Sequence, residues 1–184
     1  ANLYVTSSAY LRVAPFDRTY YGWAHPQGVL LRWDARDPIL SSVARIVVKV
    51  GSSVLSDGPG KLDTGVVRRL AGEVAALKRS GAEVLVVSSG AILSGWQRLG
   101  LSERPRTTVA KQAAAAVGQS RLMRAWEAAF ARRGVTAAQV LLTQDDLRQR
   151  HRYLNARNTL FELLRLGVVP VINENDTVAV EEIK

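Results

Sequence analysis

Four short polar stretches, each placed directly after an apolar run, hold the residues best suited to chemistry. The last of them, 173–176, reads NEND, with two amides and two carboxylates in a row. The amides of Asn173 and Asn175 can donate and accept hydrogen bonds, while the carboxylates of Glu174 and Asp176 suit an ammonium group. This combination predicts a site for an amino acid, and an ordinary polar turn is the alternative. The other three stretches are 51–53, 88–91 and 143–146.

Lys49 lies in an otherwise apolar run, two residues before Gly51. If the lysine is buried there, its ammonium group needs a partner, because burying an uncompensated charge is costly. A phosphate is the natural partner, since Gly51 would let the backbone approach closely and the amides of Ser52 and Ser53 would cradle the phosphate oxygens. An edge-strand lysine that points into water explains the same pattern equally well.

The two middle stretches are less specific. SSGA at 88–91 offers two hydroxyls and a glycine close to an expected helix start, which is a fair site for a carboxylate or a phosphate. A simple helix cap is the alternative for this stretch. At 143–146 we expect Asp145 and Asp146 to cap the helix that follows.

Several familiar motifs are missing from the sequence. Gly60-Lys61 is followed by Leu62 and has no glycine five residues before Gly60, so it is not a Walker motif, and no G-x-G-x-x-G follows a strand. His25 and His151 lie outside the polar stretches, so neither a Ser-His-Asp triad nor a histidine metal cluster is expected, and no metal ligand is assigned. Phosphoryl transfer to a carboxylate fits these limits, because a carboxylate is already ionised at neutral pH. Such catalysis depends on positioning and on charge neutralisation by lysine, magnesium and backbone amides.

Composition narrows the class of protein. The 184 residues are 47% hydrophobic, which is enough for one ordinary core. The net charge of +9 favours anionic partners, but the arginines are spread along several expected helices without interleaved aromatics, so nucleic acid is not an expected partner. The chain has no cysteine, which suits a cytoplasmic location. No apolar run approaches the ~20 residues needed to span a bilayer, so no membrane association is expected.

Strands and helices alternate from residue 45 onward. Apolar runs predict strands at 45–50, 83–88, 138–143 and 168–172, and helical spacing predicts helices at 63–80, 108–133 and 153–166. Asp63 is expected to cap the first helix, and glycines at 81, 134 and 167 are expected to end the three helices. Gly118 is the one weak point of the second helix. This order predicts a parallel sheet covered on both faces, with ligands at the carboxyl ends of its strands.

Residues 1–44 differ in character from the rest. They hold four of the five tyrosines and three of the six prolines, without a sustained helical or strand period. We expect an irregular leader here, and a small aromatic-rich cap packed on the rest is the alternative.

Taken together, the motifs resemble the glutamate 5-kinases in order and spacing over about residues 45–184. The segments that carry the resemblance are VVKVGSSVL, VVSSGAILSG, KQAAAAVGQSRLM, QVLLTQDDL, YLNARNTL and VPVINENDTVAVEEI. The resemblance implies an amino-acid-kinase fold, an α/β/α sandwich with a mainly parallel sheet. It also implies transfer of the ATP γ-phosphate to the side-chain carboxylate of L-glutamate with Mg²⁺ present, as the first step of proline synthesis.

The resemblance also assigns roles to residues. Lys49 is similar to the catalytic, ATP-contacting lysine of the family, and Gly51 and Ser52 to its phosphate loop. The substrate-binding positions implied by the resemblance are Ser89, Gly90, Asn173 and Asp176. L-Glutamate is the implied partner, proline an implied feedback inhibitor, and a homo-oligomer a possible assembly.

This chain departs from the family at both ends. Residues 1–44 have no counterpart in the family, which continues past EEIK into a Gly-Asp-Asn-Asp motif and a nucleotide-binding half. We therefore expect residues 45–184 to be the amino-acid-binding part of a truncated kinase domain. The alternatives to an active glutamate 5-kinase are an inactive fragment that at most binds glutamate or proline, and a sister kinase that acts on another carboxylate or carbamate.

Overall fold

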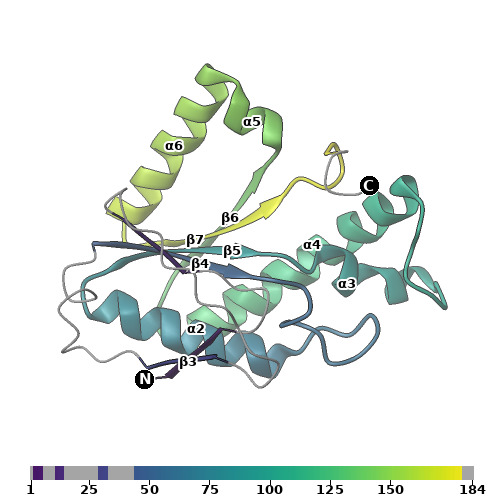
Figure 1. The fold of residues 1–184 in the computed structure, drawn as a ribbon, viewed down its shortest axis with the longest axis horizontal. Helices are drawn as coiled ribbons and strands as arrows, with labels where there is room; N and C mark the ends of the chain where they lie inside the picture. Colours follow the sequence, from purple (N-terminus) through teal and green to yellow (C-terminus); the bar gives the residue numbers. More distant parts are fainter. Residues whose placement is uncertain (1, 6–10, 15–28, 33–43, 180–184) are drawn as a thin grey trace.

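A twisted sheet of five strands organises the molecule (Figure 1). The computed structural model describes residues 2–5, 11–14, 29–32 and 44–179. The strand order is β2-β4-β5-β7-β6, in which β4, β5, β7 and β6 are parallel and β2 runs antiparallel at one edge. The mainly parallel sheet of the prediction is thus confirmed. The bounds are β2 (Leu11–Ala14), β4 (Arg45–Val50), β5 (Glu83–Ser88), β6 (Ala137–Leu142) and β7 (Val169–Glu174).

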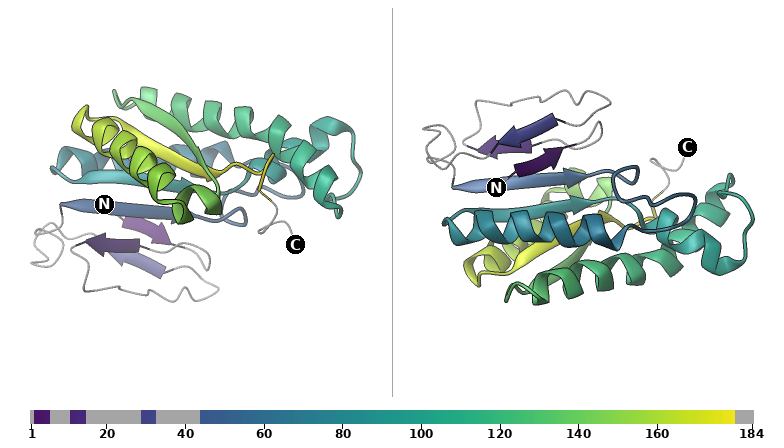
Figure 2. Two further views of the ribbon diagram at one scale, coloured as in Figure 1. Left: turned by 90° about the horizontal axis from the view of Figure 1, so that it is seen from above. Right: turned by 90° about the horizontal axis from the view of Figure 1, so that it is seen from below.

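Helices cover the two faces of this sheet unequally (Figures 1 and 2). On one face α2 (Thr64–Arg79) and α4 (Thr108–Ala131) close a core that includes Val67, Leu122 and Trp126, packed against the buried side chains of β4, β5 and β7. The other face carries α6 (Arg150–Arg165), in which Leu164 alone is buried among the helix residues. The short helices are α3 (Ala91–Gly95), α5 (Gln144–Arg148) and the 3-10 turn η1 (Trp96–Leu99).

The helix ends follow the sequence signals closely. The Asp63 carboxylate accepts hydrogen bonds from the amides of Gly65 and Val66 at 2.8 and 3.0 Å, which caps α2 as predicted. Gly81, Gly134 and Gly167 adopt φ values of +96°, +67° and +71° after α2, α4 and α6. Such values favour glycine, because other residues clash there. The last helix differs from its prediction: it begins at Arg150, and a separate α5 precedes it.

Gly118 has a packing role that the sequence did not reveal. A Cβ atom at this position would lie 1.8 Å from the carbonyl oxygen of Ala91, and one at Gly95 would lie 1.9 Å from that of Ala114. The backbones of α3 and α4 therefore touch, and only glycine fits at these two positions. The weak point predicted for α4 is the place where α4 holds α3.

Part of the leader forms strands. Within the described residues of 1–44, β1 (Asn2–Val5) pairs antiparallel with β3 (Val29–Arg32), and β2 pairs with β4. The prediction of irregular chain is wrong for these three segments. The rest of 1–43, like 180–184, lies outside the described residues.

Candidate functional site

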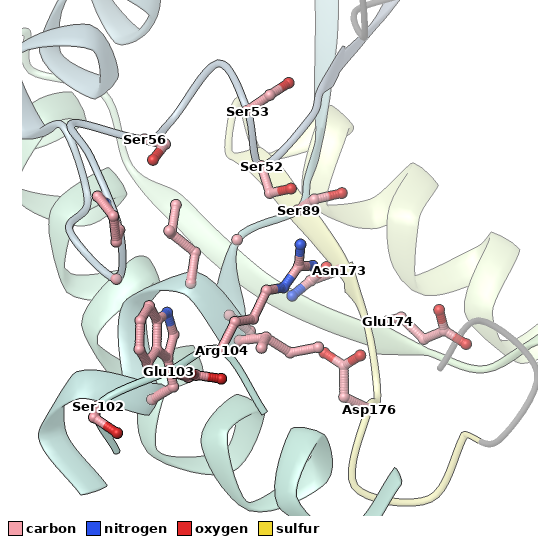
Figure 3. Close-up of a pocket in the computed structure, with 17 residues that line it drawn as sticks. Ser52, Ser53, Ser56, Ser89, Ser102, Glu103, Arg104, Asn173, Glu174 and Asp176 are labelled. Atoms are coloured by element: carbon pink, nitrogen blue, oxygen red, sulfur yellow. The ribbon is translucent and has the colours of Figure 1, made fainter. Parts of the chain in front are cut away.

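An open cleft of about 590 Å³ lies at the carboxyl ends of β4, β5 and β7 (Figure 3). Three of the four predicted polar stretches contribute to its lining. β5 and β7 are neighbours in the sheet although β6 lies between them in sequence, so the polar residues that follow these two strands meet at adjacent carboxyl ends. Ligands of open parallel sheets bind at such a position.

Five of the seven predicted site residues line this cleft, namely Ser52, Ser89, Gly90, Asn173 and Asp176. The other two, Lys49 and Gly51, are not among the lining residues. Gly51 is buried, and its carbonyl oxygen accepts a hydrogen bond from the Val54 amide at 3.1 Å, which starts a turn.

The premise that Lys49 is buried is wrong, because its side chain is exposed. Side chains alternate along β4, so Ile46, Val48 and Val50 point into the core and Lys49 shares the opposite face with Arg45. On that face the Arg45 guanidinium lies 4.5 Å from the centre of the Phe161 ring of α6.

The two serines at the carboxyl end of β5, Ser88 and Ser89, have different roles. Ser88 is 1% exposed, and its hydroxyl accepts a hydrogen bond from the buried indole nitrogen of Trp126 at 2.9 Å. Ser89 lines the cleft, and its amide donates to the carbonyl of Val50 at 2.9 Å, which ties this loop to the end of β4. Gly90 follows with φ +113°, a conformation suited to glycine, and α3 begins directly after it.

The NEND stretch is divided in a similar way. The Asn173 amide is nearly buried and donates to the side-chain oxygen of Gln119 in α4 at 2.7 Å. The Asn175 side chain accepts from the Thr177 hydroxyl at 2.6 Å and serves the turn. Asp176 and Glu174 line the cleft beside Asn173. The stretch is therefore both a turn and a wall of the cleft.

The loop 51–63 forms the opposite wall and is braced internally. Ser56 bridges to Leu62, the Ser56 hydroxyl donates to the Gly58 carbonyl at 2.8 Å, and Gln97 donates to the Pro59 carbonyl at 2.7 Å. At the exposed tip of the loop, the hydrogen bond to the Asp57 carboxylate raises the pKa of Lys61 above its usual range. These contacts give the wall a defined shape.

The sequence interpretation missed a further group of lining residues, which follows α3. The group includes Trp96, Glu103 and Arg104. Trp96 is 5% exposed and supports the floor of the cleft, while Glu103 and Arg104 come from the segment that leads into α4. The charged pair in SERPR was the available signal, but nothing in its local pattern indicated that the segment folds back toward β5 and β7.

The fourth polar stretch stays outside the cleft. Thr143 and Asp146 form a reciprocal cap at the start of α5: the Thr143 hydroxyl accepts from the Asp146 amide at 3.2 Å, and the Thr143 amide donates to the Asp146 carboxylate at 2.8 Å. Hydrogen bonds from Thr143, together with the Arg152 guanidinium at 3.1 Å, hold the pKa of Asp146 below its usual range. The cap predicted here is confirmed for Asp146.

The described residues hold neither a metal-binding cluster nor a helix that could span a membrane. Among them, no group of three or more histidine, cysteine or acidic residues is arranged to hold a metal ion. The helices of the same residues include none that is both long and apolar enough to cross a membrane.

Comparison with known proteins places this chain in a family. The profile of the amino acid kinase family matches residues 44–183. The chain belongs to the amino acid kinase family. Among curated relatives of this chain, the glutamate 5-kinase of Pelobacter propionicus is 57% identical over 149 residues, which are 81% of this chain and 40% of the relative.

Other relatives give the same result. The glutamate 5-kinase of Geobacter sp. (strain M21) is 56% identical over 149 residues, again 81% of this chain and 40% of the relative. That of Bordetella petrii is 53% identical over 146 residues, 79% of this chain and 39% of the relative. The chain thus spans about 40% of the length of these relatives.

Proposed function

We propose that this amino acid kinase transfers the γ-phosphate of ATP to the side-chain carboxylate of L-glutamate, the first step of proline synthesis. The name of its relatives supports this proposal. The observation that carries it is the convergence of Ser89, Asn173 and Asp176 on one cleft at the carboxyl ends of β5 and β7. Serine, amide and carboxylate together match the polar groups of an amino acid.

In this proposal the substrate lies along the two central strand ends. The Asp176 carboxylate receives the substrate ammonium group, because opposite charges and hydrogen bonds reinforce one another at that contact. Asn173 is well placed to add a fixed contact, since its own amide is held by Gln119. Ser89 and Gly90 approach the side-chain carboxylate from the end of β5.

The chemistry needs no general base from the protein. An ionised carboxylate oxygen of glutamate attacks the γ-phosphorus, a new O–P bond forms, and the bond to the bridging oxygen breaks as ADP leaves. The product is an acyl phosphate. Catalysis then rests on alignment and on neutralising the charge of the phosphates.

The nucleotide is proposed to meet the loop that follows β4. The backbone of Gly51 and Ser52 would contact the phosphates, and Lys49, exposed on the adjacent face, would supply a positive charge. Mg²⁺ fits this arrangement, because it is usually held by nucleotide phosphates with one or two carboxylates rather than by a protein cage. Glu174, which also lines the cleft, would provide an oxygen ligand of the right kind.

Further partners follow from the same proposal. L-Proline carries the ammonium and carboxylate groups that the cleft would recognise in glutamate, which supports its role as a feedback inhibitor. Exposed apolar side chains on α5 and α6, including Leu147 and Leu154, support a homo-oligomer. A cytoplasmic location agrees with a biosynthetic enzyme that uses ATP.

Binding of L-glutamate to the chain, measured by isothermal titration calorimetry, tests the substrate assignment. Asp176→Ala is expected to abolish this binding. Asp145→Ala, which removes a carboxylate from the first turn of α5, outside the cleft lining, is the matched control and is expected to bind like the original chain. Unchanged binding by Asp176→Ala would contradict the assignment.

Catalysis is tested separately with ATP, Mg²⁺, L-glutamate and hydroxylamine. Hydroxamate well above the ATP-free blank demonstrates that an acyl phosphate forms. Glutamate binding without any hydroxamate supports the alternative of a chain that binds but does not catalyse.

A further inference from the structure

Negative side chains outnumber positive ones along the cleft. Among the described lining residues, three carry carboxylates, Glu103, Glu174 and Asp176, and one carries a positive charge, Arg104. An amino acid with an acidic side chain brings one ammonium group and two carboxylates. The acidic residues suit the ammonium group. Arg104 is the one cationic side chain of the described lining that could bind a ligand carboxylate.

Arg104 is available for such a contact. Its side chain is exposed and makes no hydrogen bond or ion pair with any residue of the described part of the chain. The neighbouring Glu103 pairs instead with Arg106, at 3.4 Å. Figure 3 shows the Arg104 side chain extending across the cleft toward Asn173. The guanidinium group is therefore directed at the place where the proposed substrate lies.

The backbone beneath Arg104 is fixed, although the side chain is exposed. Pro105 follows it directly and is buried, and Thr107 caps α4 two residues further on. A residue that precedes proline is restricted to extended backbone conformations. Arg104 thus projects from an anchored segment, which lowers the entropy that is lost when it binds a ligand.

The reaction decides which ligand carboxylate this arginine can hold. A guanidinium that binds a carboxylate in a bidentate manner occupies both oxygens. The side-chain carboxylate of the substrate must keep a lone pair for attack on phosphorus, whereas the α-carboxylate takes no part in the reaction. We propose that Arg104 binds the α-carboxylate of the substrate and so makes the kinase specific for an α-amino acid.

This inference rests on the proposed function, and three related ligands test it. L-Glutamate carries both carboxylates, 4-aminobutanoate lacks the α-carboxylate, and L-2-aminobutanoate lacks the side-chain carboxylate. Calorimetric titrations with the whole chain compare the three. Arg104→Leu is expected to weaken L-glutamate binding by about tenfold and to leave 4-aminobutanoate binding unchanged.

A matched control separates this contact from general electrostatics. Arg98→Leu removes the same charge from η1, outside the cleft lining, and is expected to bind all three ligands like the original chain. Arg104→Lys keeps the charge without the planar fork and is expected to recover part of the lost affinity.

The possible results are distinct. If Arg104→Leu binds L-glutamate normally, or weakens 4-aminobutanoate to the same degree, the proposal is overturned. A selective loss for 4-aminobutanoate would assign Arg104 to the side-chain carboxylate and would also overturn it. Failure of the original chain to bind L-glutamate would remove the substrate assignment itself, and this is measured before any variant.

Discussion

The loops after β5 and β6 differ in function, although both are short polar stretches at the carboxyl end of a parallel strand. The loop 88–91 contributes Ser89 and Gly90 to the cleft, whereas the loop 143–146 folds into a cap for α5 and stays outside it. From the sequences, a helix cap was expected for TQDD, whereas SSGA was left open between a ligand site and a helix cap.

Strand position explains the difference. β5 has β4 on one side and β7 on the other, so its loop meets two neighbouring polar loops. Among the described strands, β6 lies at the sheet edge and has β7 as its one neighbour. A polar loop becomes part of a site where neighbouring strand ends converge, and the same residue types otherwise satisfy their own backbone.

The largest expected loss of stability comes from disturbing the contact between α3 and α4, which holds the loop after β5 in place. Gly118→Ala puts a Cβ within 1.8 Å of the Ala91 oxygen and must push α3 away from α4. We expect the free energy of unfolding to fall by about 2 kcal/mol, because overpacking outweighs the gain in helix propensity. Urea denaturation measures this change.

Ala116→Gly, at an exposed position of the same helix, is the control for backbone propensity. It should cost about 1 kcal/mol through propensity alone. A Gly118→Ala chain more stable than the original would show that α3 and α4 are not in backbone contact.

A smaller loss of stability is expected at the end of β5, where Ser88 contacts the core. Ser88→Ala leaves the buried indole N–H of Trp126 without its acceptor, which should lower the free energy of unfolding by about 1.5 kcal/mol. Ser89→Ala, one residue later, should leave that energy unchanged and weaken glutamate binding instead. Denaturation followed by tryptophan fluorescence and calorimetry separates the two effects, and equal loss of stability in both variants would contradict the division between the two serines.

The smallest expected effect is a change in the pKa of Asp146 at the start of α5. Thr143→Ala removes a hydroxyl that donates to the Asp146 carboxylate at 2.7 Å, so the pKa of Asp146 should rise toward its usual range. In the original chain this pKa is depressed, so the stabilisation by Asp146 is present above the usual carboxyl range and is lost as the pH falls through the folded-state pKa. A carboxyl carbon NMR titration of both chains measures the shift.

Glutamate binding at neutral pH is the control for this last variant. It should be unaffected, because neither Thr143 nor Asp146 lines the cleft. Weaker binding by Thr143→Ala would show that the two loops are linked.

The sequence predicted the sheet well because its signals are local. Apolar runs indicated the four parallel strands, and glycines at 81, 134 and 167 ended helices where their positive φ values are required. For Lys49 the sequence left burial and exposure equally open, because strand alternation alone does not say which face a helix covers. Gly118 and Arg104 were misjudged or missed because their roles depend on contacts between segments distant in sequence.

A nitrogen–proton NMR titration of the chain with L-glutamate tests the central claim, that the converging ends of β5 and β7 form the amino acid site. We expect amide signals of Ser89, Gly90 and Asn173 to shift in a saturable way, while those of Thr143 and Asp146 stay in place. Shifts confined to the loop after β6, or an unchanged spectrum at saturating glutamate, would contradict the claim.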